Sequence, residues 1–164
     1  MNLPTQGEKI LVALDGSAPS NHALEKAISL AQKCPKCRGK IFLIRVLEMS
    51  DQESDDSAGP NRLVEDMKKN LGQIEQEVKE HGLECESSVY VGPQIAPLIV
   101  QEAKDKDIDI IAMGTHGWTG DTAIVAMGSV ARKVLCSAPC PVLIIPPKMS
   151  EQKQAECSQS RKEG

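Results

Sequence analysis

The stretch MGTHGWTGDTAIVAMGS, residues 113–129, contains the residues best suited to bind an anion. Gly114 and Gly117 directly follow an apolar run, and Gly128 precedes Ser129 at the start of a helical pattern. Glycine lets backbone N–H groups converge on a phosphate, and a helix N-terminus adds oriented donors and a favourable dipole. The spacing therefore indicates a phosphate site, while the same residues also fit a strand end, a turn and a helix cap.

Apolar runs and helical periods alternate along the chain and would position this stretch. A second polar stretch, LDGS at residues 14–17, also follows an apolar run, and Ser17 is expected to cap the first helix with Pro19 in its first turn. Strands are expected over residues 9–17, ending in a polar turn, and over 40–48, 83–92, 107–114 and 141–146. Helices are expected from Ser17 to about residue 31 and over residues 64–78, 96–106 and 130–136.

The order of these elements predicts one Rossmann-like α/β domain. Strands that alternate with helices form a parallel sheet, here five-stranded, with helices on both of its faces. If the winding reverses once, ligands bind beyond the carboxyl ends of the strands at that point, where residues 14–17 and 113–117 would lie. The domain is expected to span residues 1–146. The polar segment 147–164 is expected to be a disordered tail.

Composition excludes several classes of function. The net charge of −4 offers no basic field for nucleic acid and no polybasic membrane anchor. No apolar run reaches membrane-spanning length, and the first ten residues lack the apolar core of a signal peptide. We therefore expect no nucleic-acid partner, no membrane association and a cytoplasmic location.

The cysteines offer a rival chemistry. Cys34 and Cys37 form a CxxC and Cys136 and Cys140 a CxxxC, which could indicate a zinc site or a redox pair. Right-handed crossovers would put the first and fourth helices on opposite faces of the sheet, so the four thiolates would have to converge around its rim. The CxxC also ends its helix, where the dipole does not lower a thiol pKa. Incidental thiols are the favoured interpretation, and no metal ligands are assigned.

The chain resembles a universal stress protein of the nucleotide-binding type from Lys9 to Pro146. The resemblance rests on ILVALDGSAPSNHALEKA, LIRV, VGPQ and IDIIAMGTHG…GSVARKVLCSAPCPVLIIP. Family members that bind ATP are similar at GxxG followed by nine residues and then G-S/T. Here ten residues separate Gly117 from Gly128, and we expect the extra residue to bulge outward.

This resemblance implies a sheet order of 3-2-1-4-5 and a bound ATP with Mg²⁺ or Mn²⁺ on its phosphates. It also implies a role for each matching residue. Ala13 and Leu14 would lie near the base, Asp15 at the ribose or beside the adenine, Val46 at the adenine through its backbone, Met113 at the sugar or base, and Gly114, His116, Gly117, Gly128, Ser129 and Val130 around the phosphates.

The function implied is ATP binding by a regulatory protein of the stress response. Hydrolysis is expected to be slow or absent, because no GxxxxGK[ST] is present and Asp121 is the one carboxylate in the phosphate stretch. A homodimer is expected through the last strand, Pro141 to Pro146, which would be an apolar sheet edge. The alternative is a dimeric stress-response adaptor that binds no nucleotide.

Overall fold

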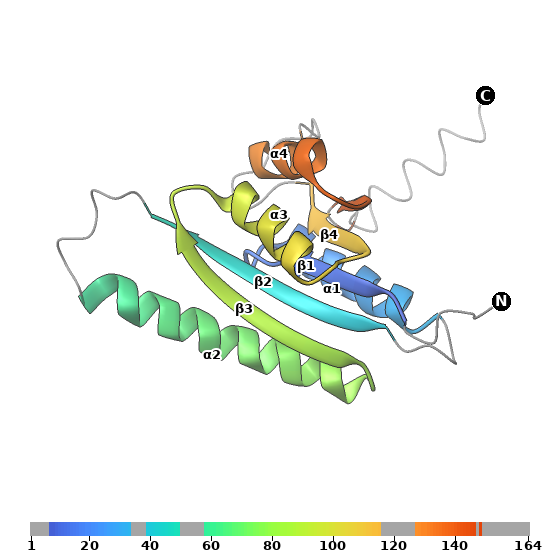
Figure 1. Ribbon diagram of the computed structural model, residues 1–164. Coiled ribbons are helices and arrows are strands. Elements are labelled where there is room, and N and C mark those ends of the chain that lie inside the picture. Colours follow the sequence, from blue (N-terminus) through green and yellow to red (C-terminus); the bar gives the residue numbers. More distant parts are fainter. Residues whose placement is uncertain (1–6, 34–38, 50–57, 116–126, 147, 149–164) are drawn as a thin grey trace, which may run out of the picture.

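The computed structural model describes residues 7–33, 39–49, 58–115, 127–146 and 148. The strands are β1 (Lys9–Ala13), β2 (Lys40–Glu48), β3 (Glu84–Gly92), β4 (Ile110–Gly114) and β5 (Val142–Ile145). They form one parallel sheet in the order β3-β2-β1-β4-β5, which confirms the predicted fold class and strand order (Figure 1). The winding reverses next to β1, so the predicted switch point lies at the carboxyl ends of β1 and its two neighbours.

Helices cover both faces of the sheet (Figure 1), and the sheet separates the interior into two apolar clusters. The helices are α1 (Ala18–Ala31), α2 (Ala58–Glu80), α3 (Ile95–Asp105) and α4 (Ser129–Ser137). One cluster lies under α1 and α2, and the other under α3 and α4. Leu11 and Val12 in β1 belong to different clusters and are both fully buried, which explains why the central strand is a continuous apolar run.

The predicted boundaries of α1, α3 and α4 are close to those observed, whereas the helix expected over residues 64–78 spans Ala58–Glu80, because its first turn carries no apolar stripe and admits Pro60. Ser17 caps α1, where its side chain accepts a hydrogen bond from the backbone N–H of Ser20, and Pro19 lies in the first turn. The helix expected over residues 96–106 spans Ile95–Asp105. Within the described part of the chain, no helix is long and apolar enough to cross a membrane. The predicted tail lies outside the described residues apart from Lys148.

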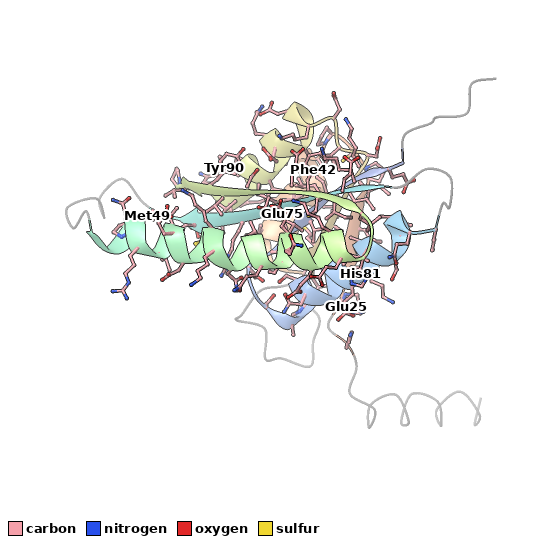
Figure 2. All side chains as sticks on the ribbon, turned by 90° about the horizontal axis from the view of Figure 1, so that it is seen from below. Glu25, Phe42, Met49, Glu75, His81 and Tyr90 are labelled. Carbon is pink, nitrogen blue, oxygen red and sulfur yellow. The ribbon has the colours of Figure 1, made fainter. Side chains whose placement is uncertain are left out.

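Polar side chains of β3, an edge strand, bond to helices on both sides of the sheet. Ser87 donates to Glu75 of α2, whereas Ser88 and Tyr90 donate to Glu102 of α3. Figure 2 labels Glu75 and Tyr90 on the two sides of this strand. Alternate residues of a strand face opposite sides, so each helix supplies the carboxylate that the polar strand residues need.

Glu102 is 4% exposed and is the acceptor for the buried end of this network. Its carboxylate lies 2.6 Å from the Tyr90 hydroxyl and 3.0 Å from the Ser88 hydroxyl. The bond to Glu102, together with burial, raises the pKa of Tyr90 above its usual value. A buried carboxylate that lost a donor would remain partly unsatisfied, so this contact fixes α3 against β3.

Replacing Tyr90 with Phe should lower the free energy of unfolding by about 1–2 kcal/mol, because Glu102 loses a buried donor. The unfolded chain releases the tyrosine proton near pH 10 and the folded chain at higher pH, so this part of the stability is complete below pH 10 and decreases as pH rises above it. Urea unfolding of both proteins at pH 8 and at about pH 10.5 measures the two effects. Ser29→Ala, which removes an exposed hydroxyl of α1, is the control. If Tyr90→Phe is as stable as wild type, the bond from Tyr90 to Glu102 does not stabilise the fold.

Candidate nucleotide site

A cavity of about 410 Å³ opens at the carboxyl ends of β1, β2 and β4. Nine of the eleven residues expected at a ligand site line it, and His116 and Gly117 lie outside the described residues. The nine are Ala13, Leu14, Asp15, Val46, Met113, Gly114, Gly128, Ser129 and Val130. Two stretches that lie about a hundred positions apart in the sequence are therefore brought to one cavity.

The N-terminal ends of α1 and α4 both meet this cavity, but they differ in how their donors are used. At α1 the Ser17 side chain accepts from the N–H of Ser20, and the Asp15 carboxylate accepts from the N–H of Ser17 at 2.9 Å. Gly16, with φ of 85°, completes this turn in a conformation that favours glycine. Groups of the protein itself therefore satisfy these α1 donors, and Asp15 stabilises the turn that precedes the helix.

At α4 no side chain among the described residues caps the helix. The N–H of Gly128 donates to Thr115 O at 2.7 Å, and the first helical bond runs from the Arg132 N–H to Gly128 O. The N–H groups of Ser129 and Val130, which both line the cavity, precede that first bond. These donors and the positive end of the helix dipole make the start of α4 the part of the cavity suited to an anion.

The opposite end of the cavity is apolar. Ile44 and Val46 come from β2, while Ile95 and Ile99 come from α3. These aliphatic side chains make this part of the cavity, the aliphatic slot, suited to a flat, apolar ring. Among the described residues that line the cavity there is no lysine or arginine, so the positive charge that these residues offer an anion comes from the starts of helices.

Several lining residues were not among those expected from the sequence. Ile44 and Glu48 could have been found from Val46, since the three alternate along β2 and share a face. Ile95 and Ile99 carry no such signal, because only the packing of α3 across β2 brings them to the cavity. The others are Ser17, Ser20 and Ala131.

Comparison with known proteins agrees with this architecture. The model of the universal stress protein family matches residues 7–146. The chain belongs to the universal stress protein family. Universal stress protein MJ0531 of Methanocaldococcus jannaschii is 32% identical over 143 residues, which are 84% of this chain and 81% of that protein. Universal stress protein YxiE of Bacillus subtilis is 28% identical over 149 residues, and the match covers 84% of this chain and 97% of that protein.

Solved structures of universal stress proteins share the fold. MJ0577 of Methanocaldococcus jannaschii superposes with a TM-score of 0.77 at 29% identity, covering 88% of this chain and 99% of its own. The universal stress protein family protein At3g01520 of Arabidopsis thaliana, solved with AMP bound, has a TM-score of 0.58 at 22% identity and covers 88% of this chain and 94% of its own.

The cysteine pairs of this universal stress protein lie away from the cavity where they are described. Cys136, near the end of α4, and Cys140, just before β5, are free thiols at the other end of the sheet. Burial raises the pKa of Cys140, which disfavours its reactive thiolate. Cys34 and Cys37 lie outside the described residues. Within the described part of the chain, no three His, Cys, Asp or Glu side chains form a group that could hold a metal ion.

Gly114, expected at the phosphates, also has a packing role in this family member. A Cβ at this position would lie 2.7 Å from Cβ of Pro19 and 3.0 Å from its carbonyl carbon. The second of these atoms is backbone, so relief would require α1 to move away from β4. Glycine is therefore needed here even before any ligand is considered, and a valine at position 114 would disturb the fold as well as the cavity.

Gly114→Ala should lower the free energy of unfolding by about 1–3 kcal/mol, because the added methyl group overpacks the contact with α1. Gly72→Ala is the matched control, since a Cβ at this exposed α2 position meets nothing within 4 Å. That variant should gain roughly 0.5–1 kcal/mol from the higher helix propensity of alanine. Thermal or urea unfolding compares the two, and a Gly114→Ala protein as stable as wild type would refute the packing role.

Proposed function

We propose that the cavity binds ATP and that the protein acts as an ATP-binding regulator of the stress response. The observation that carries the proposal is the N-terminus of α4, which no side chain among the described residues caps, in the same cavity as Asp15 and an aliphatic slot. A volume of about 410 Å³ lies within the usual range for small-molecule sites. Relatives solved with AMP, from Arabidopsis thaliana, and with dAMP, from Archaeoglobus fulgidus, support a nucleotide as the ligand.

In this proposal each part of the nucleotide has its own surroundings. The phosphates bind the N–H groups and hydroxyl at the start of α4, through Ser129 and Val130. The ribose hydroxyls donate to Asp15, since carboxylates are strong acceptors. The base enters the slot between Val46 and Ile99, with the backbone of Val46 available to its polar edge. His116 and Gly117 remain candidates for the phosphate end on the resemblance alone.

A metal ion would accompany the phosphates rather than occupy a protein site. The described residues provide no cluster of ligands for Mg²⁺ or Mn²⁺. Mg²⁺ is commonly held by substrate phosphates and water with few protein ligands, which suits this cavity. The ion would supply positive charge, and this chain's own residues would orient the nucleotide. We propose slow or no hydrolysis, because the described lining residues include no lysine or arginine to stabilise a transferring phosphoryl group.

Asp15→Ala should weaken the binding of ATP by about 1.5–3 kcal/mol, the range for a hydrogen bond to a charged group. The binding of AMP should weaken equally, because the two ligands share the ribose. Asp15→Asn retains an oxygen for the Ser17 N–H and separates loss of the α1 turn from loss of the ligand contact. Asp66→Ala, on the exposed face of α2, is the control. Calorimetric titration measures all four proteins. A variant that loses ATP but retains AMP would place Asp15 at the phosphates or the metal.

The same titration tests the function itself. Wild-type protein should bind ATP, ADP and AMP, and Mg²⁺ should strengthen the binding of ATP and ADP. If none of the three produces heat and none raises the unfolding temperature, the ATP-binding function is wrong and the adaptor that binds no nucleotide takes its place.

A homodimer through β5 is the partner that we propose for either function. Among the described strands β5 pairs with β4 alone and is the last strand of the sheet. Leu143 on β5 is 36% exposed, which leaves apolar surface at a sheet edge. Pairing of this edge with a second copy would cover it. The free thiols Cys136 and Cys140 fit the reducing cytoplasm that we propose as the location.

Leu143→Lys should convert the dimer to a monomer, because the pairing edge would bring two lysines into one interface. Leu63→Lys is the matched control: Leu63 is also an exposed leucine, 47% exposed, but lies on α2. Light scattering at high micromolar concentration gives the mass of each protein. A monomeric wild type, or a Leu143→Lys protein that remains dimeric, would refute the interface.

A further inference from the structure

Glu48 lines the cavity, although the proposed function assigns it no role. The register pairs Ala13 with Ile44, so Glu48 lies beyond the carboxyl end of β1. It shares a face of β2 with Ile44 and Val46, and its side chain is exposed. Glu48 is therefore at the rim of the cavity, on the side of the aliphatic slot.

The sheet order places the end of β2, with Glu48, and the start of α4, beside the end of β4, on opposite sides of β1. The start of α4, which no side chain among the described residues caps, provides roughly half a positive elementary charge on the β4 side. Asp15, just after β1, and Glu48, at the end of β2, provide two carboxylates. The starts of α1 and α3, where Ser17 and Ile95 line the cavity, each add a partial positive charge of about one half, and their sum is smaller than the charge of the two carboxylates. The described lining residues include no lysine or arginine to offset them.

We infer that Glu48, together with Asp15, restricts the site to nucleotides whose ribose carries no phosphate. This inference rests on the proposed function, because it takes the 5′-phosphates to bind at α4 and the ribose at Asp15. A phosphate on O2′ or O3′ would then lie beside the carboxylates, well within the distance of about 8 Å over which salt leaves charges unscreened. ATP, ADP and AMP satisfy this restriction, whereas nucleotides with a 2′- or 3′-phosphate do not.

This specificity would result from electrostatic repulsion of the additional phosphate and not from steric exclusion. The rim is open, so a second phosphate has room, and what opposes it is repulsion by fixed negative groups. Glu48→Gln removes one charge while keeping the size of the side chain. This substitution therefore separates charge from steric exclusion.

The experiment is calorimetric titration of AMP, adenosine 3′,5′-bisphosphate and adenosine 2′,5′-bisphosphate. In wild-type protein the dissociation constant of each bisphosphate should exceed that of AMP at least about tenfold. In Glu48→Gln this ratio should shrink by a factor of about three or more, and raising the salt concentration should shrink the wild-type ratio in the same direction. Glu77→Gln, an exposed α2 residue with the same change in net charge, should retain the wild-type ratio.

The outcomes distinguish the role of Glu48 from the nucleotide site itself. If AMP binds and either bisphosphate binds equally well, or if Glu48→Gln and Glu77→Gln give the same ratio, the role of Glu48 is wrong while the nucleotide site stands. If wild-type protein binds neither AMP nor ATP, the proposed function fails and this inference fails with it.

Discussion

The close approach of β4 to the first turn of α1 is the contact on which the cavity depends. No Cβ fits at Gly114, because Pro19 lies directly against it. The next residue, Thr115, donates its N–H to Ile145 of β5 and accepts from the N–H of Gly128 at the start of α4. One short segment at the end of β4 thus fixes α1, β5 and α4 relative to one another, and the cavity is the space left between them.

The N-terminal ends of α1 and α4 both lie at this cavity but differ in which groups bind their backbone N–H donors, because different residues precede the two helices. Asp15 and Ser17 occupy N–H groups at the start of α1, so that helix end is completed by its own chain. Gly128 has no side chain with which to cap α4, and the corresponding donors face the cavity. Similar helix ends therefore become a structural turn in one place and a candidate anion site in the other.

The sequence was sufficient where local pattern and tertiary environment agree. β1 and β2 are continuous apolar runs because helices bury them on both faces, and Ser17 is a typical cap. β3 lacks a continuous apolar run because its polar side chains find acceptors, Glu75 and Glu102, on the helices directly before and after it, and these contacts are not visible in the local pattern. The walls contributed by α3 could not be predicted for the same reason, since they depend on how two elements pack. The packing role of Gly114 likewise requires knowing that Pro19 lies beside it.

The division of the interior into two clusters has an evolutionary consequence. The aliphatic walls of the cavity come from the cluster beneath α3 and α4, including Ile44, Ile99 and Met113, whereas Leu14 represents the cluster beneath α1 and α2. Substitutions in the α1/α2 cluster at positions other than Leu14 would therefore alter thermal stability while leaving the residues that line the cavity unchanged. Substitutions in the cluster beneath α3 and α4 would alter which ligands the cavity can bind. A lineage could in this way diversify its ligands on one side of the sheet while the opposite side preserved the architecture.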